Sequence, residues 1–274
     1  MARPVKIGLL QTTAVLGDVE HNIKNAVKMI ADAAKDGANI VCLPELFATA
    51  YNLETLGHKT EQLIEEKFGY IKAEISKAAK DNKVYVISPS GEPTGMPGVV
   101  YNSAMVFDDG GNHMGSYAKS HLWALERFHF RDGNSYPVFD TKYGRIGIVI
   151  CYDMGFPEAM RQLTLQGAEL VFVPSAWCLP DMDMRDLNIP QRALENILFV
   201  AGVNLYTKDP NLHLFGKSKI CNPRGKILKE LGIDKEEYAV VEIDMDDVKH
   251  HRSIIPYLKD RKPSIYERIT DLEI

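Results

Sequence analysis

The chain has 274 residues, of which 45% are hydrophobic and 25% charged, a balance that is typical of globular proteins and excludes disordered, collagen-like and low-complexity chains. Lys and Arg number 32 against 37 for Asp and Glu, so the net charge of −5 removes the electrostatic case for binding nucleic acid or an anionic membrane. No apolar run approaches the roughly 18 residues of a membrane helix, and the four cysteines are far apart with no C-x-x-C pair. These features predict a soluble cytoplasmic enzyme.

The first half of the chain alternates strand and helix signals. Short apolar runs predict buried strands, and apolar residues three and four positions apart predict helices. In chain order we expect a strand at Val5–Gln11, a helix at His21–Lys35, a strand at Ala38–Glu45, a helix at about Glu61–Asp81, and a strand followed by a hairpin that turns at Asp109-Gly110-Gly111. This alternation is typical of the α/β class.

The second half repeats the pattern. In chain order we expect a strand at Gly144–Asp153, a helix from Pro157 to Gln166, a strand at Gly167–Ser175, a helix at about Ile189–Asn196 with a strand after it, a hairpin around Asn222-Pro223-Arg224-Gly225, and a closing strand. No linker, Ser/Gly-rich segment or charge block divides the chain. We therefore expect residues 1–274 to form a single domain, with an extended tail from about residue 249.

Two stretches of the sequence resemble each other. Gly37–Pro44 and Gly167–Pro174 share the form G-A-x-φ-V, and each follows a helix that is preceded by a strand containing K-I-G or R-I-G. One interpretation is a pair of β-α-β units in two sheets related by a pseudo-twofold axis. The other is that this pattern is simply how a helix leads into a buried parallel strand. The sequence leaves both open.

Three reactive side chains follow expected strands: Glu45, Lys119 and Cys151. A strand holds such a residue rigidly where the next loop opens to substrate. A buried carboxylate has a raised pKa, so it can take the proton of a thiol and return it to a leaving amine, while an ammonium can stabilise a thiolate and a tetrahedral oxyanion. Each residue alone has an ordinary structural explanation, as a core cysteine, a capping acid or a solvated lysine. Together they are sufficient for acyl transfer.

Five blocks of the sequence resemble those of the nitrilase superfamily of carbon–nitrogen hydrolases. They are Leu43-Pro44-Glu45, the Y-x-K-x-H-L block Tyr117–Leu122, the C-x-D-x-x-F-P-E block Cys151–Glu158, Pro174-Ser175-Ala176, and Arg192–Asn196. The resemblance extends from about Val5 to beyond Tyr238. Five blocks in the expected order and spacing are a specific signal, which no single block would be.

The resemblance implies a role for each reactive residue. Cys151 would be the nucleophile, Glu45 the general base and acid, and Lys119 the stabiliser of the oxyanion, with the backbone N–H of Tyr152 as a second donor. Glu126 matches a further glutamate of the family, which lies near the nucleophile and helps to position the substrate and the lysine. The resemblance also implies a four-layer α-β-β-α sandwich, no metal and no organic cofactor.

We expect the chain to form a homodimer or a larger homo-oligomer. The resemblance implies that subunits pack through the helices flanking the nucleophile, with the tail crossing to a neighbour. The apolar stretch Ile254–Leu258 is too short to form a core by itself, which agrees with this expectation.

The residues allow three alternatives to this assignment. A Cys–His pair would use His121, with His129 behind it, but His121 shares the face of Lys119 only if the strand persists, and a histidine there more often anchors a loop. A metal site is disfavoured because His250-His251 are adjacent and the cysteines never pair. A silent binding or scaffold homologue is disfavoured because every expected catalytic position carries a competent residue.

The residues after the nucleophile indicate the branch of the family. True nitrilases typically continue with Trp-Glu, whereas Tyr152-Asp153 resembles the amidase and carbamoyl-amidase branches. We therefore expect hydrolysis of a small linear amide or N-carbamoyl compound, with a small nitrile as the alternative substrate. The expected pocket walls are Tyr51, Tyr152, Ser175, Ala176 and Trp177.

Three aspartates, Asp181, Asp183 and Asp186, lie in the segment that should border the pocket. In one interpretation they hold the ammonium group of a substrate. In the other they belong to a solvated loop in which Arg185 neutralises one charge. The sequence does not choose between the two.

Overall fold

Two β-sheets form the centre of the molecule in the computed structural model, which describes residues 2–209 and 211–270. The first sheet has the order β17 (Glu237–Asp244), β1 (Pro4–Gln11), β2 (Ile40–Cys42), β3 (Tyr85–Pro89), β6 (Ser103–Phe107) and β7 (His113–Ala118). The second has the order β16 (Ile227–Glu230), β15 (Lys219–Cys221), β12 (Phe199–Asn204), β11 (Leu170–Ser175), β10 (Gly144–Ile148) and β9 (Val138–Thr141). In each sheet three parallel strands are flanked by antiparallel ones.

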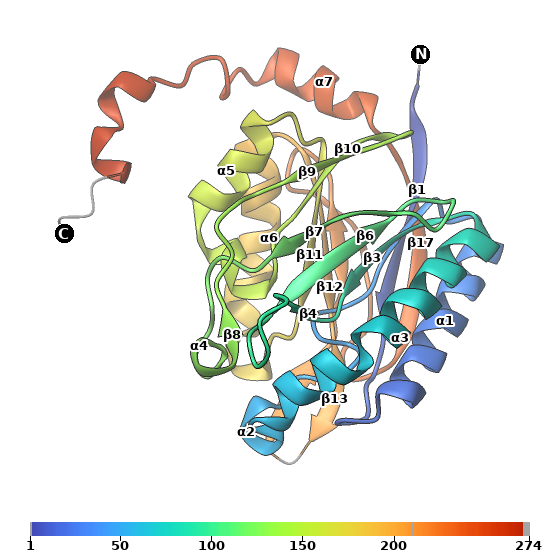
Figure 1. The fold of residues 1–274 in the computed structure, drawn as a ribbon. Helices are drawn as coiled ribbons and strands as arrows, with labels where there is room; N and C mark the ends of the chain where they lie inside the picture. The colour runs from blue at the N-terminus through green and yellow to red at the C-terminus, as the bar shows by residue number, and fades with distance from the viewer. Residues whose placement is uncertain (1, 210, 271–274) are drawn as a thin grey trace.

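Helices cover the outer face of each sheet (Figure 1). The covering helices are α1 (Val19–Lys35) and α3 (Lys59–Asn82) on the first sheet, and α5 (Pro157–Leu165) and α6 (Met182–Asn196) on the second. Ile23 and Ile30 of α1 are buried together with Val41 and Val86 of the first sheet, because apolar residues at helical spacing share one face. The predicted four-layer α-β-β-α sandwich is confirmed. No helix in the described part of the chain is long and apolar enough to cross a membrane.

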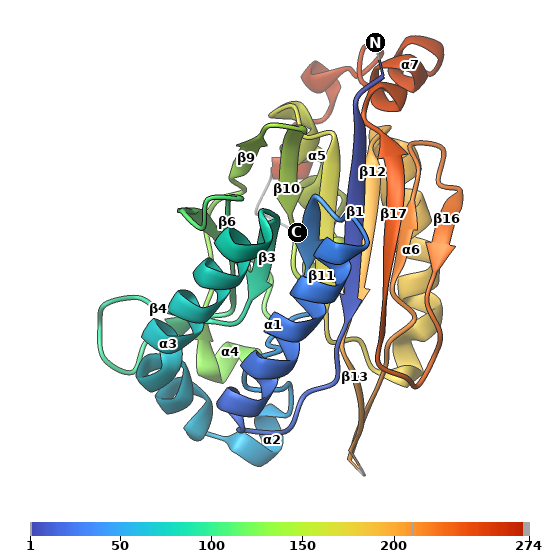
Figure 2. The same ribbon diagram turned by 90° about the vertical axis from the view of Figure 1, so that its right-hand side faces the viewer.

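An apolar core fills the space between the two sheets (Figure 2). Alternate residues of β1, Val5, Ile7 and Leu9, point into this core, whereas Leu10 points to the helix layer. On the other side Phe172 of β11 is fully buried in the same core. Each such side chain contributes roughly 1.5–3 kcal/mol when it is removed from water. Since both sheets share this core, a single domain remains our proposal for the chain.

The two stretches that resemble each other form equivalent β-α-β units in different sheets. One unit is β1-α1-β2 and the other is β10-α5-β11, and each pairs its two strands in parallel. The glycine of each K-I-G or R-I-G strand allows close packing, because a Cβ on Gly8 would lie 2.7 Å from Val41 and one on Gly147 would lie 2.9 Å from Leu163. The structure thus favours the interpretation with two related units.

The sequence missed several short elements. They are the edge strand β9, the ribbon of β13 (Tyr206–Asp209) and β14 (Leu212–Phe215), the small sheet of β4 (Glu92–Pro93), β5 (Val100–Tyr101) and β8 (Phe130–Arg131), and the helices α2 (Leu53–Leu56), α4 (Glu126–His129) and α7 (Asp246–Ile254). The helix expected at Ile189–Asn196 in fact begins at Met182. Pro190 lies within this helix, where it withholds one backbone hydrogen bond.

The tail leaves the sandwich after α7 (Figure 1). It contains two short 3-10 turns, Pro263–Ile265 and Glu267–Thr270, and residues 271–274 lie outside the described part. Its apolar side chains Ile254, Tyr257, Ile265 and Ile269 are each more than half exposed. This part of the chain therefore offers an apolar surface that the subunit itself does not cover.

Candidate active site

The structure brings the three reactive residues to one place. Glu45 follows β2, Lys119 follows β7 directly, and Cys151 begins a 3-10 helix, Cys151–Gly155, shortly after β10. The Lys119 ammonium donates a hydrogen bond to Glu45 Oε1 over 2.7 Å. Lys119 and Cys151 are close enough for their charges to affect each other's pKa. One sheet thus supplies the acid and the ammonium, and the other sheet supplies the thiol.

The turn at Cys151 is held in an unusual backbone conformation. Its φ of 51° lies in the left-handed region, which costs a residue with a side chain about 1–2 kcal/mol. Asp153 stabilises the turn, because its carboxylate accepts the N–H of Ile150 at 3.0 Å and the hydroxyl of Tyr117 at 2.6 Å. The same carboxylate accepts the N–H of His121 at 2.8 Å. Asp153 therefore connects the cysteine turn to the segment that carries Lys119.

A cluster of fully buried charges surrounds Lys119. The ammonium also donates to Glu126 Oε1 over 2.8 Å, and the Tyr51 hydroxyl donates to the same oxygen over 2.6 Å. Asn102 donates to Glu45 Oε1 over 2.8 Å. Buried charges persist only when each has partners, and every charge here is hydrogen-bonded. Glu126, which lies on α4, thus belongs to the same cluster as Glu45 and Lys119.

Burial sets the protonation of these groups. Burial raises the pKa of the Glu45 carboxyl above its usual value, although the Lys119 charge opposes the shift. Burial raises the pKa of the Cys151 thiol well above its usual value, and the Glu45 charge adds to this effect. Burial alone would lower the pKa of the Lys119 ammonium, but the carboxylates of Glu126 and Glu45 raise it overall. The cluster therefore pairs a stable ammonium with a carboxylate that binds a proton more readily than usual, beside a protonated thiol.

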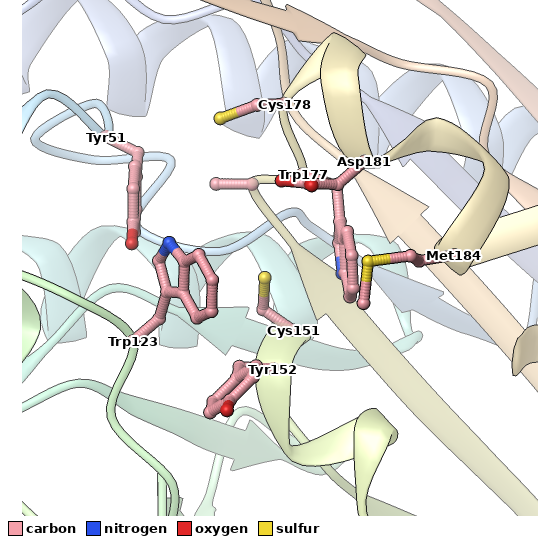
Figure 3. Close-up of a pocket in the computed structure, with 9 residues that line it drawn as sticks. Tyr51, Trp123, Cys151, Tyr152, Trp177, Cys178, Asp181 and Met184 are labelled. Atoms are coloured by element: carbon pink, nitrogen blue, oxygen red, sulfur yellow. The ribbon is translucent and has the colours of Figure 1, made fainter.

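A small cavity of about 50 Å³, partly open to solvent, lies over the cysteine. Figure 3 shows the Cys151 thiol pointing into the space between Trp123 and Trp177. The walls are mostly apolar and come from Tyr51, Trp123, Tyr152, Ala176, Trp177, Cys178, Asp181 and Met184. Small-molecule sites are typically lined by apolar side chains with a few polar groups, as this one is. Glu45, Lys119 and Glu126 lie behind the wall, where the Ala176 N–H donates to Glu45 Oε2 at 2.9 Å. The same N–H opposes, to a small extent, the rise in the pKa of the Cys151 thiol.

Four of the five expected wall residues line this cavity, and Ser175 does not. The Ser175 side chain is fully buried, and its hydroxyl donates to the Val173 carbonyl at 3.1 Å. Ser175 is the last residue of β11, so its hydroxyl turns back onto its own strand. The next residue, Ala176, forms the wall instead.

The three aspartates have different surroundings. Asp181 lines the cavity, and Asp183 is exposed in the first turn of α6. Asp186 pairs with Lys217 at 2.5 Å and with Lys219 at 2.6 Å, so its charge is already neutralised. The expected solvated loop is wrong from Met182 onward, because that part is helical.

Arg185 does not neutralise a charge at the surface, as one interpretation expected. Its side chain is completely buried, and its guanidinium donates to the carbonyls of Lys217 at 2.9 Å and Gly202 at 3.2 Å. Of the three aspartates only Asp181 therefore lines the cavity.

The model of the family described as carbon-nitrogen hydrolase matches residues 6–253 of this chain. The chain belongs to the carbon-nitrogen hydrolase family. The match covers both β-α-β units and all five motif blocks, so the resemblance inferred from the sequence is confirmed.

Curated relatives of this carbon-nitrogen hydrolase carry several activities in their names. A nitrilase of Pyrococcus abyssi is 33% identical and aligns over 96% of this chain and 100% of its own. A 2-oxoglutaramate amidase of Bacillus subtilis is 32% identical over 95% of this chain and 98% of its own. An N-carbamoylputrescine amidase of Solanum tuberosum is 29% identical over 99% of this chain and 96% of its own.

Solved structures show the same fold. A carbon-nitrogen hydrolase from Helicobacter pylori G27 superposes with a TM-score of 0.93 at 26% identity, over 98% of this chain and 99% of that chain. A mutant amidase from Nesterenkonia sp. AN1 superposes with a TM-score of 0.85 at 26% identity, over 96% of each chain. In that amidase the acetamide moiety of fluoroacetamide is covalently added to the active-site cysteine.

Several residues of this carbon-nitrogen hydrolase site were missed in the sequence. Asn102 on Glu45 gives no signal, because a single asparagine between two strands has no characteristic spacing. Asp153 was quoted only as part of a motif, although it holds the cysteine turn. Trp123 reaches the cavity from a segment that has no strand or helix pattern of its own. Met184 reaches it from the part of α6 that was not expected to be helical.

The Cys–His alternative has no support in the geometry. The His121 ring contacts Asp153 Oδ1 through Nδ1 at 2.9 Å and stacks on Phe156 with a centroid separation of 3.7 Å. It lies in a neighbouring depression and not in the wall of the Cys151 cavity. His129 contacts Glu61 on α3. His121 thus anchors the loop after β7.

Proposed function

We propose that the protein hydrolyses the C–N bond of small linear amides or N-carbamoyl compounds through a thioester on Cys151. The observation that carries this proposal is the buried Glu45–Lys119–Glu126 cluster placed directly behind a thiol that opens into an apolar cavity. Such a site supplies a nucleophile, a group that moves protons and an electrostatic partner for an oxyanion. In this role the protein needs no metal and no organic cofactor.

The proposed reaction has two halves. In the first, Cys151 Sγ bonds to the carbonyl carbon while Glu45 takes the thiol proton, and the oxyanion lies between the Lys119 ammonium and the Tyr152 N–H. The C–N bond then breaks, and Glu45 returns the proton to the departing ammonia or amine. In the second half, water attacks the thioester, loses a proton to Glu45 and releases the thiol. When the amine of a carbamoyl substrate departs in the first half, the second half releases carbamic acid, which decays to carbon dioxide and ammonia.

Amides are favoured over nitriles by the residues that follow the nucleophile. Tyr152 lines the cavity and Asp153 holds the turn, in the positions where true nitrilases typically have Trp-Glu. The relatives named as a 2-oxoglutaramate amidase and an N-carbamoylputrescine amidase support this choice. A small nitrile is the second candidate, because the Pyrococcus abyssi relative is named a nitrilase.

A substrate panel tests the proposal. Ammonia release is measured for short amides, N-carbamoyl amines and nitriles of matched chain length, with the Cys151→Ala variant as the control. We expect amides or carbamoyl amines to have the highest kcat/KM. Release from nitriles alone would select the second candidate, and no turnover of any compound would favour a silent homologue.

The first prediction concerns Asp181, the aspartate that lines the cavity. A charge-assisted hydrogen bond contributes about 1.5–3 kcal/mol, so Asp181→Asn is expected to raise the KM of an amine-bearing amide roughly tenfold or more and to spare a neutral amide of equal length. Asp183→Asn is the matched control, because Asp183 is exposed and lies outside the cavity wall. Equal effects of Asp181→Asn on both substrates would show that Asp181 does not select charge.

The second prediction is the pH dependence of kcat/KM. Glu45 must be deprotonated to take the thiol proton, so activity should fall as the pH drops through the Glu45 pKa, which burial places above its usual value. The pKa of the Cys151 thiol is raised, so no second rise is expected near the pKa of about 8.5 of an ordinary thiol. Initial rates measured from about pH 4 to pH 9 test both the fall in activity at low pH and the absence of a second rise at high pH. A rate that followed free thiol ionisation would contradict the role of Glu45.

The third prediction is assembly into a homodimer or larger. The exposed apolar side chains Ile254, Tyr257, Ile265 and Ile269 of the tail support this proposal. Sedimentation at micromolar concentration should give at least twice the mass of one chain. The double variant Ile265→Asp/Ile269→Asp should shift the equilibrium toward monomer. A monomer for the unmodified protein would overturn the proposal.

A further inference from the structure

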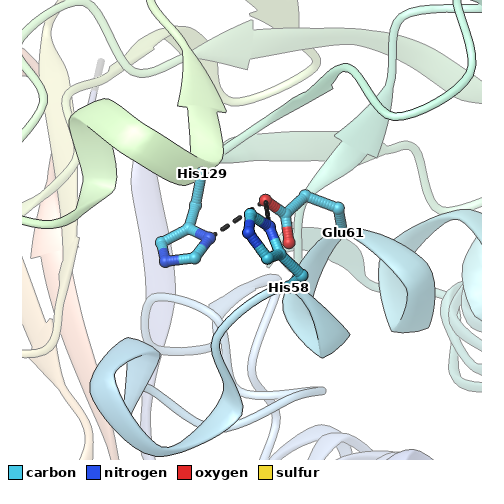
Figure 4. Close-up of side chains that lie close together, drawn as sticks. All are labelled: His58, Glu61 and His129. Carbon is cyan, nitrogen blue, oxygen red and sulfur yellow. Dashed lines mark hydrogen bonds and ion pairs between the residues drawn. The ribbon is translucent and has the colours of Figure 1, made fainter.

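Three side chains outside the cavity converge at the start of α3. His58 is the residue that precedes α3, Glu61 lies in its first turn, and His129 ends α4 (Figure 4). His129 Nδ1 lies 3.0 Å from Glu61 Oε1, and His58 Nδ1 lies 3.5 Å from the same oxygen. One ligand atom from each of the three residues lies within 4.8 Å of the other two. Two imidazoles and a carboxylate therefore face one another across less than 5 Å.

The Glu61 carboxylate has an unsatisfied oxygen at this point. The residue is only 8% exposed, yet Glu61 Oε2 has no hydrogen-bond partner among the described residues. A buried polar atom without a partner is costly, and most such atoms in native proteins are paired with protein, water or an ion. The contacts with the two histidines involve only the other oxygen, Oε1. Glu61 thus retains binding capacity beside two nitrogen donors.

We propose that His58, Glu61 and His129 bind a divalent transition-metal ion of the zinc class. Zinc takes imidazole nitrogen and carboxylate oxygen at about 2.0–2.2 Å, which places neighbouring ligand atoms of a tetrahedron about 3.3 Å apart. The two observed separations of 3.0 Å and 3.5 Å lie on either side of this value. The His58 side chain is 92% exposed, so a fourth position is open to water. Imidazole with carboxylate favours Zn²⁺ or Co²⁺ over Mg²⁺ or Ca²⁺.

The surroundings oppose a cation in one respect and favour it in another. The positive end of the α3 dipole lies at His58, and it disfavours a cation. The full negative charge of Glu61 in the first turn of α3 offsets this partial charge. A metal ion here would connect α3 to α4, the helix that also carries Glu126. The site would therefore fix the helix from which Glu126 reaches Lys119.

The experiment measures metal binding directly. The Cys151→Ala variant serves as the parent, so that the reactive thiol cannot bind metal and the result does not depend on the proposed reaction. After treatment with a chelator, Co²⁺ is titrated and followed by its visible absorption, and Zn²⁺ is measured by equilibrium dialysis. We expect one equivalent at micromolar concentration. His58→Ala should weaken metal binding at least about 100-fold. Because His58 is exposed, this variant should keep the fold.

Matched variants separate this site from other histidines and cysteines. His251→Ala, on α7, should bind as the parent does, whereas Glu61→Gln should weaken binding, because the amide removes the charge and keeps the shape. Absence of stoichiometric binding in the parent would overturn the proposal. Equal affinity in His58→Ala and the parent would also overturn it, since the metal would then sit on other residues.

Discussion

Glu45→Gln is expected to lower turnover roughly 10²–10⁴-fold, the range for loss of a general acid–base group. In the proposed reaction Glu45 moves a proton in both halves, so the variant should fail to form the thioester and to hydrolyse it. Binding should change little, because Glu45 lies behind the cavity wall and Ala176 and Tyr51 form that wall. The loss should therefore appear mainly in kcat.

The fold should tolerate this change at a small cost. A glutamine Oε1 can still accept from Asn102 and Lys119, as Glu45 Oε1 does at 2.8 Å and 2.7 Å. The amide nitrogen would then face the Ala176 N–H, which now donates to Oε2, and two donors would meet. An unmade buried hydrogen bond costs about 1–3 kcal/mol. Denaturant unfolding should show a loss of that size, well short of unfolding the protein.

Intact-mass measurement after rapid quenching examines the same reaction. The unmodified enzyme should show an acyl adduct that maps to Cys151 and is absent in Cys151→Ala. Cys178 provides an internal comparison, because it is a second thiol that lines the same cavity. Normal turnover in Glu45→Gln would contradict the role of Glu45 as the acid–base group. An adduct on Cys178 would contradict the role of Cys151 as the nucleophile.

Lys119→Arg is expected to reduce kcat roughly a hundredfold or more, comparable to the loss of an oxyanion donor. Arginine keeps the charge, but its planar guanidinium is larger than an ammonium and cannot place its donors in the same directions. Lys119 is fully buried between Glu45 and Glu126, so the larger group must displace one of them. Steady-state kinetics with the best amide of the panel measures the effect.

Lys219→Arg is a matched control for this substitution. Lys219 is also buried and pairs with two carboxylates, Asp186 at 2.6 Å and Glu230 at 2.5 Å, but it lies outside the cavity wall. Both variants enlarge a buried cation, so both should lower the free energy of unfolding. Only Lys119→Arg should lower kcat by two orders of magnitude. Near-normal kcat in Lys119→Arg would mean that Lys119 is structural.

Local patterns in the sequence predicted most of the regular elements. The apolar alternation of β1 and the helical spacing of Ile23 and Ile30 follow from burial on one face, and the structure has both. The start of α6 was expected at about Ile189, seven residues after its true start at Met182. The short β5 and β8 pair only through tertiary contact, and two-residue strands carry no periodic signal.

The reactive residues could be proposed from motifs because each lies within three residues of the end of a strand. Their supporting groups could not, since the partners are distant in the chain: Asn102 lies 57 positions from Glu45, and Glu126 lies 75 from Tyr51. The cluster of His58, Glu61 and His129 could not be predicted for the same reason, because His129 on α4 is distant in the chain from Glu61 on α3 and the two meet only in the folded protein. The direction of a side chain could not be predicted from the motifs either. Ser175, for example, turns away from the cavity and donates to its own strand.

The two carboxylates on Lys119 restrict how the ammonium can turn. An ammonium has three hydrogens, and Glu45 and Glu126 each accept one of them. At most one hydrogen is left, and its direction is fixed because the other two cannot rotate without breaking a buried bond. In the proposed reaction an oxyanion can therefore receive a single bond from this residue, along one line of approach. A substrate whose oxygen lies far off that line would lose the contact, since hydrogen bonds weaken steeply once the N–H···O angle falls below about 120°. The angular tolerance for substrate binding is therefore set on the far side of Lys119, away from the cavity.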